Sequence, residues 1–176
     1  MPFHWNGLEP PDIDEEVHCK MAVKVGDVAP DFTLAATGEK EQITLSELRG
    51  QPVVLLFYPF AFSPVCTDEL CSVQSEWELY AQLGAQVLGI SVDSIYVQKA
   101  FAEANGIRFP LLTDFNKEVA PKYGAFYEQL GNWKGVAKRA AFVIDKDGKV
   151  AYTWISEDPK VKPDVNEVRQ VLAGLK

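Results

Sequence analysis

The chain has 176 residues, with 17 basic and 25 acidic side chains and a formal charge of −8. This length suits one domain that builds a hydrophobic core without disulfide staples. The acidic balance and the lack of any basic run argue against a nucleic-acid or anionic-membrane surface, because both attract clustered lysine and arginine. The longest apolar segment, 52–62, is too short to span a bilayer, and no signal peptide precedes it, so we expect a cytosolic protein.

Residues 1–24 are predicted to form an acidic N-terminal extension. They contain Pro10-Pro11 and a dense group of acidic side chains without any clear period. Residues 25–176 are predicted to form the folded domain, because regular alternation of apolar segments and turns begins there.

The first part of this domain contains the segments 31–36 and 42–50, separated by a turn at 37–39, followed by a predicted buried strand within 52–60. That third segment is apolar on both faces, which is typical of a central strand in a covered sheet. A helix is expected from about residue 66 to residue 83, with Gly84 as its stop. Its apolar stripe consists of Leu70, Val73, Trp77 and Ala81.

The second part repeats strand and helix and then changes to a hairpin. Strands are expected in 85–93 and 109–114, with a helix over 94–106 between them. Two β-rich runs around a turn at 145–148 predict a hairpin, and 163–176 predicts a closing amphipathic helix. This order predicts an α/β protein of the thioredoxin-like fold, with a central mixed β-sheet flanked by helices.

Cys66 is the candidate nucleophile. It follows the central strand by a few residues and opens the predicted helix, where free backbone amides and the helix dipole favour thiolate over thiol. The two histidines, His4 and His18, both lie in the extension, so a Cys–His pair has no partner within the domain. The activating cation is therefore expected to be an arginine.

Arg139 is the arginine predicted to lie near Cys66. It begins the predicted strand 140–145, and an antiparallel pairing with the central strand would bring its start beside Cys66. Arg49 precedes the central strand and belongs to the opposite end, and Arg169 lies on the last helix. Arg108 is the alternative candidate.

The segment PFAFSPVC, residues 59–66, resembles the P-x-x-x-(T/S)-x-x-C active-site motif of the peroxiredoxins of the AhpC/TSA superfamily. The segment KRAAFVIDKDGKV, 138–150, is similar to the part of that family that carries its active-site arginine. This resemblance extends from about residue 25 to the C-terminal helix.

The resemblance implies a role for each matching residue. Cys66 would be the peroxidatic cysteine and Ser63, where threonine is usual, would hydrogen-bond the peroxide. Arg139 would stabilise the thiolate, Pro59 would shield the site from water, and Glu69 would orient the arginine. Serine keeps the hydroxyl but lacks the methyl group that restricts its rotamer, so we expect weaker preorganisation.

Cys71 raises the question of how oxidised Cys66 is resolved. Five residues apart on an ideal helix, the two Cα atoms are roughly 8–9 Å apart, and a disulfide tolerates at most about 7 Å. A bridge would therefore require the helix to unwind. The spacing resembles the Q-type, or bacterioferritin-comigratory, peroxiredoxins, which resolve through an intramolecular disulfide. The segment PFAFS, however, is more similar to the AhpE-type branch, which uses an external thiol.

Cys19, in the extension, is a further candidate for resolving Cys66. A zinc site built from His18, Cys19, Cys66 and Cys71 has suitable residue types but lacks any paired spacing. No glycine-rich phosphate loop accompanies a strand–helix unit, so we expect no organic cofactor.

The favoured function is a thiol peroxidase that reduces hydrogen peroxide and small organic hydroperoxides. It would be recycled by thioredoxin or a similar thiol donor, as a monomer or a homodimer. A one-cysteine peroxidase resolved by an external thiol is the main alternative. A thioredoxin-like disulfide oxidoreductase is disfavoured because it would use a C-x-x-C motif, which is absent, and a redox-sensing interaction domain remains a third reading.

Overall fold

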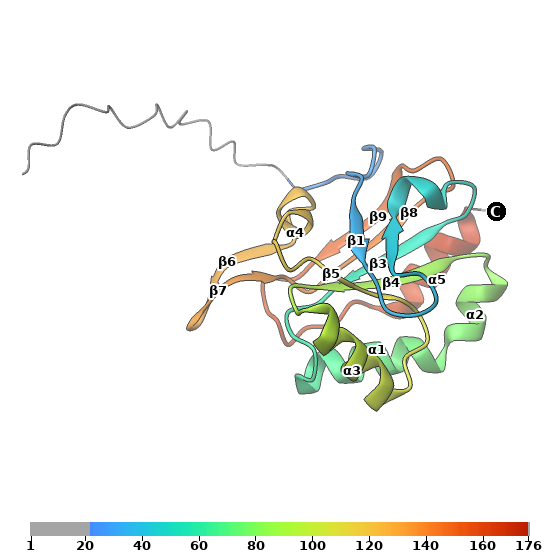
Figure 1. Cartoon of the computed structure of the whole chain (residues 1–176). Helices are drawn as coiled ribbons and strands as arrows, with labels where there is room; N and C mark the ends of the chain where they lie inside the picture. Colours follow the sequence, from blue (N-terminus) through green and yellow to red (C-terminus); the bar gives the residue numbers. More distant parts are fainter. Residues whose placement is uncertain (1–21, 176) are drawn as a thin grey trace, which may run out of the picture.

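The structure, a computed structural model, describes residues 22–175 (Figure 1). Most of the predicted extension, including His18 and Cys19, lies outside the described residues.

A five-stranded mixed sheet forms the centre of the domain, in the order β5-β4-β3-β8-β9. Strands β3 (Val53–Phe57), β4 (Gln86–Ser91) and β5 (Leu111–Thr113) run parallel to one another. Strand β8 (Ala140–Ile144) is antiparallel to β3 and forms a hairpin with β9 (Val150–Ile155). The predicted central strand, the parallel pairing and the hairpin are confirmed, as is the thioredoxin-like fold class.

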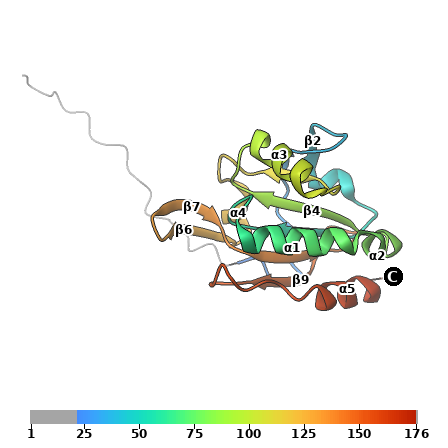
Figure 2. The same cartoon turned by 90° about the horizontal axis from the view of Figure 1, so that it is seen from below.

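The two faces of the sheet are covered differently. Because side chains alternate along a strand, Val54 and Leu56 of β3 pack against one group of elements, and Leu55 and Phe57 pack against the other. The first face carries α1 (Pro64–Ser75), α2 (Trp77–Gln82), α3 (Ile95–Asn105) and α5 (Val165–Gly174). Figure 2 shows α1 between α3 and α5 on this face.

The opposite face carries smaller elements. They are β1 (Thr33–Ala35), β2 (Gln42–Thr44), the 3-10 helix η1 (Leu45–Leu48) and α4 (Val119–Lys122). Strand β1 and helix α4 lie above the sheet in Figure 1, and α1, α2 and α3 lie below it.

The single helix predicted over 66–83 is wrong in its boundaries. The structure has two helices, because Glu76 leaves the helical region at φ −102° and ψ 11°. After this break the buried side of the second helix shifts by one position: Tyr80 is buried, and Ala81, predicted on the apolar stripe, is exposed.

A second hairpin was not predicted. Strands β6 (Phe126–Leu130) and β7 (Trp133–Ala137) pair antiparallel and project from the left edge of the molecule in Figure 1. Their outer halves are exposed, so the apolar alternation is weak. The turn residues Gly131-Asn132 are a hairpin signal that sequence reasoning overlooked, and Gly131 adopts the positive φ of 59° that this turn needs.

Candidate active site

Cys66 lies in the first turn of α1, just beyond the carboxyl end of β3. The loop 59–63 joins the two elements, and Ser63 is the N-cap of the helix with extended backbone angles. Pro64 at the first helical position fits because its missing N–H would have no helical acceptor. The helix thus begins two residues before the predicted start. Cys66 still lies where the free amides and the positive end of the dipole favour an anion.

Arg139 contacts the sulfur of Cys66. The antiparallel register pairs Phe57 with Ala140, so the residue before Ala140 lies at the carboxyl end of β3, as predicted. Arg139 Nη2 donates a hydrogen bond to Cys66 Sγ at 3.2 Å, and both residues are buried. Arginine has donors and no acceptor, so the sulfur must accept, which a thiolate does better than a thiol.

Two further groups hold the guanidinium of Arg139 in place. Its Nε and Nη2 donate to the carbonyl of Pro159 at 2.9 and 2.8 Å. Its Nη1 forms an ion pair with Glu69 in which each side chain is only 2% exposed. These contacts fix the fork of the arginine and leave Nη2 directed at the sulfur. Pro159 was missed by sequence reasoning, because a backbone carbonyl on a distant connection carries no residue-type signal.

Glu69 makes the stability of the folded state depend on pH. Burial raises the pKa of its carboxyl from 4.5 to about 7, and Arg139 opposes the shift. The folded state therefore binds this proton more tightly than the unfolded chain does. The stability that this group contributes is present in full below pH 4.5 and is lost as pH rises to about 7.

We therefore compare the free energy of unfolding of the natural protein with that of Glu69→Gln. The difference between them should fall by about 3 kcal/mol as the pH rises from 4.5 to about 7. Urea unfolding at several pH values measures it. Taking the difference between the two proteins cancels the other titrating groups. Parallel pH profiles would show that Glu69 does not titrate in this way.

A mainly apolar pocket of about 300 Å³ is lined in part by Cys66. Residues from the loop, the start of α1, the β6–β7 turn and the segment before α5 line it: Pro59, Phe60, Ser63, Pro64, Val65, Cys66, Leu130, Gly131, Trp133, Arg139, Pro159 and Lys160. The rings of Phe60 and Trp133 pack edge to face with centroids 5.2 Å apart and form one wall. The overlooked hairpin thus completes the pocket. The predicted site residues Pro59, Ser63, Cys66 and Arg139 all line this pocket.

The hydroxyl of Ser63 has a defined direction. Its Oγ donates to the carbonyl of Phe60 at 3.0 Å and makes no capping bond to α1. Because the hydroxyl proton is used in this contact, the oxygen lone pairs remain available to accept a hydrogen bond from a bound molecule.

Cys71 lies on the same helix as Cys66 but away from the pocket. It is half-buried, with its sulfur 4.0 Å from Oδ1 of Asn105 at the end of α3. Both cysteines are free thiols. Since α1 is helical across both positions, a bond between them requires this part of the helix to unwind.

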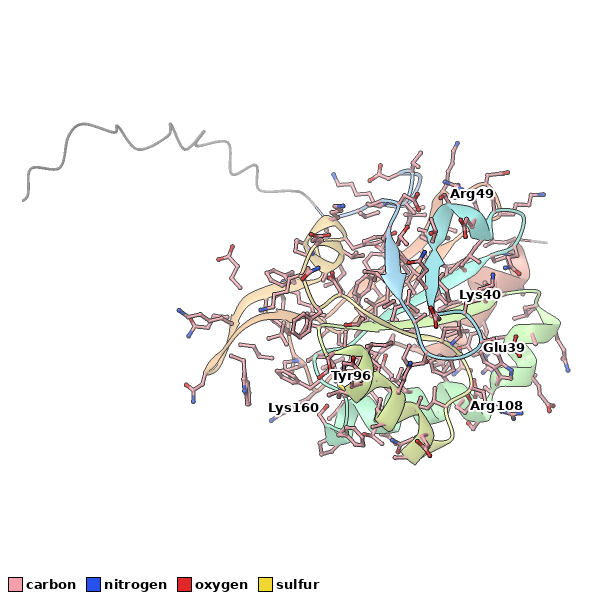
Figure 3. The ribbon with its side chains drawn as sticks, viewed as in Figure 1. Glu39, Lys40, Arg49, Tyr96, Arg108 and Lys160 are labelled. Atoms are coloured by element: carbon pink, nitrogen blue, oxygen red, sulfur yellow. The ribbon has the colours of Figure 1, made fainter. Side chains whose placement is uncertain are left out.

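The other arginines lie elsewhere. Figure 3 shows Arg49 and Arg108 on one side of the view and Lys160, which lines the pocket, on the other. Arg49 donates to the carbonyl of Asp147 in the β8–β9 turn, as expected for the opposite end of β3. Arg108, the alternative partner for Cys66, lines a separate pocket with Trp77 and Gln86, so the structure does not support that alternative.

Within residues 22–175, no group of three or more histidine, cysteine or acidic side chains is arranged to hold a metal ion. Two members of the zinc set considered from the sequence, His18 and Cys19, lie outside this range. In the same part of the chain no helix has the length and apolarity needed to cross a bilayer.

Comparison with known proteins bears on this arrangement. The sequence description of the AhpC/TSA family matches residues 25–153. The chain belongs to the AhpC/TSA family. It is 38% identical over 87% of its length to chloroplastic peroxiredoxin Q of Triticum aestivum, of which 68% is covered. It is 34% identical over 75% of its length to peroxiredoxin Bcp of Escherichia coli, of which 85% is covered.

The fold agrees with solved members of the family. The crystal structure of peroxidoxin BcpB from Mycobacterium tuberculosis superimposes with a TM-score of 0.76 at 36% identity, covering 88% of this chain and 99% of that one. The chain is thus a peroxiredoxin related to the Bcp and Q types, and its activity is that of a thiol-dependent peroxidase.

Proposed function

We propose that Cys66 is the peroxidatic cysteine and that Cys71 resolves it within the same chain. The observation that carries the first part is the hydrogen bond from Arg139 to the Cys66 sulfur, made by two residues that line the same apolar pocket. A buried sulfur that accepts a hydrogen bond from a guanidinium is favoured as the thiolate, which is the nucleophilic form.

In the first step the Cys66 thiolate attacks one oxygen of the peroxide. An S–O bond forms, the O–O bond breaks, and the departing oxygen leaves as water or an alcohol after taking up a proton. Arg139 stabilises the negative charge that moves from sulfur to the departing oxygen. The lone pairs of Ser63 Oγ accept from the peroxide O–H, and Pro59 restricts access of water. Sulfur is oxidised to sulfenic acid and the peroxide is reduced.

In the second step the Cys71 thiol attacks the sulfenic sulfur, a disulfide forms and water leaves. This step requires residues 66–71 of α1 to unwind, which also separates Glu69 from Arg139, because Glu69 lies between the two cysteines. A dithiol donor such as thioredoxin then reduces the disulfide and allows the helix to re-form.

The pocket favours hydrogen peroxide and small organic hydroperoxides as substrates. A volume of about 300 Å³ exceeds the space that hydrogen peroxide needs, and the rings of Phe60 and Trp133 suit an apolar substituent. A thiol donor implies a reducing compartment, so we place the protein in the cytoplasm. Monomer and homodimer both remain compatible with this mechanism, which is complete within one chain.

The variant Cys71→Ser tests the resolving step. We expect peroxide to oxidise Cys66 of this variant at the natural rate, but the sulfenic acid to persist. Turnover with thioredoxin should fall by about tenfold or more, because the variant lacks the nucleophile held close to the sulfenic acid. Trapping with dimedone followed by mass spectrometry measures the sulfenic acid. Full turnover with thioredoxin in this variant would show that an external thiol, or Cys19, resolves Cys66 instead.

A further inference from the structure

Asp93 contacts the loop 59–63 from the segment after the neighbouring strand β4. Asp93 lies two residues beyond the end of β4 and is half-buried. Its Oδ2 accepts from the backbone N–H of Ala61, in the middle of the loop, at 2.8 Å. The same oxygen accepts from Ser91 Oγ at 2.6 Å. One carboxylate oxygen therefore joins the active-site loop to the end of the neighbouring strand.

Behind Asp93 the contacts continue into a buried polar network. Gln98 of α3 donates from Nε2 to Ser91 Oγ at 2.9 Å and to the carbonyl of Leu112 at 3.0 Å. Tyr58, the residue before the loop, donates from its hydroxyl to Gln98 Oε1 at 2.6 Å. Ser91, Gln98 and Tyr58 are all fully buried. Burial also raises the pKa of Tyr58, which keeps its hydroxyl a neutral donor. Such a network is rigid because its polar groups satisfy one another.

The loop needs a support of this kind, because it contains a strained residue. Phe62 has a φ of 64°, in the left-handed region that side chains other than glycine rarely adopt. Holding it there costs on the order of 1 kcal/mol, and such a conformation persists only where the surroundings impose it. Asp93 fixes the residue before Phe62. The ring of Phe62 packs on Phe101 of α3 with centroids 5.1 Å apart.

We propose that Asp93 is a positioning residue of the peroxide site, acting through the Ala61 N–H to hold the loop 59–63. The carboxylate is directed at the backbone and does not line the pocket with Cys66. Its effect is on the loop residues that would contact the peroxide, Pro59 and Ser63. The thiolate itself depends on α1 and Arg139, which Asp93 does not touch. This inference rests on the proposed roles of Pro59 and Ser63.

Two reactions of Cys66 separate positioning of the peroxide from activation of the thiolate. The first is single-turnover oxidation by hydrogen peroxide, and the second is alkylation by iodoacetamide, which needs the thiolate but not the peroxide site. We expect Asp93→Ala to slow the peroxide step about tenfold, as misplacement of a binding group does. Its alkylation rate should stay within about twofold of the natural one, since the Arg139 contact is unaltered.

The conservative variant Asp93→Asn keeps an oxygen that can accept from Ala61 and Ser91, so it should restore the peroxide step to within about threefold. Asp145 offers a matched control at the other end of the sheet, because its Oδ1 accepts from the backbone N–H groups of Asp147 and Lys149. Asp145→Ala should leave both rates unchanged.

Three results would overturn the proposal: an unchanged peroxide step in Asp93→Ala, a parallel loss of alkylation, or an Asn variant as slow as the Ala variant. If Asp93→Ala does not fold, Ser91→Ala removes only the hydroxyl that donates to Asp93. It should slow the peroxide step alone, by about threefold, and an unchanged peroxide step would again overturn the proposal. Failure of the proposed function itself is separate, because the natural protein would then show no oxidation at Cys66.

Discussion

Cys66→Ser is expected to have no measurable peroxidase activity. A serine hydroxyl remains protonated at neutral pH and cannot replace a thiolate as the attacking group. The substitution changes one buried atom, so the fold and the pocket should persist. Peroxide consumption with a thioredoxin system measures the loss.

The matched control for Cys66→Ser is Cys71→Ser, which removes a thiol from the same helix but leaves the first step intact. Thermal unfolding of the two variants should be similar, which separates lost chemistry from lost folding. Residual activity in Cys66→Ser comparable to that of the natural protein would remove Cys66 from the mechanism and make Cys71 or Cys19 the nucleophile.

Arg139→Ala should slow oxidation of Cys66 by about 10²- to 10³-fold, the usual effect of removing one donor from a charge-stabilising site. The variant loses both the hydrogen bond to the sulfur and the cation that would face the departing oxygen. It also leaves Glu69 buried without its ion-pair partner, which should lower the free energy of unfolding by about 3 kcal/mol. Stopped-flow oxidation by hydrogen peroxide is the measurement.

Two variants make the Arg139 result specific. Arg139→Lys keeps the charge but loses the planar fork that reaches Pro159, Glu69 and the sulfur together, so only partial recovery is expected. Arg108→Ala removes an exposed arginine from a different pocket and should oxidise at the natural rate. A normal rate in Arg139→Ala would contradict the proposed role.

The position of Arg139 could be predicted from the sequence because it depends only on strand direction. Once 140–144 pairs antiparallel with the central strand, the residue before it must lie at the carboxyl end of β3, next to the helix that carries Cys66. The ion pair between Glu69 and Arg139 agrees with the resemblance. Glu69 lies three residues after Cys66 in α1, which brings its carboxylate to the arginine that contacts the sulfur.

Other parts of the site depend on tertiary contacts that leave no local pattern. Pro159 acts through its backbone carbonyl, and Asp93 reaches the loop through a backbone N–H, so neither residue type reveals the contact. The β6–β7 hairpin that carries Trp133 was missed because it has one exposed half and weak apolar alternation. The break at Glu76 was missed because the apolar stripe continued across it in sequence.

The measurement that tests the central claim most directly is the intact mass of the reduced protein after one equivalent of hydrogen peroxide. It is made under non-reducing conditions, with fragment mapping of any disulfide. We predict a loss of two hydrogens and a bridge between Cys66 and Cys71, the product of oxidation at the first residue and resolution by the second. An unmodified Cys66, with the peroxide left unconsumed, would contradict the account.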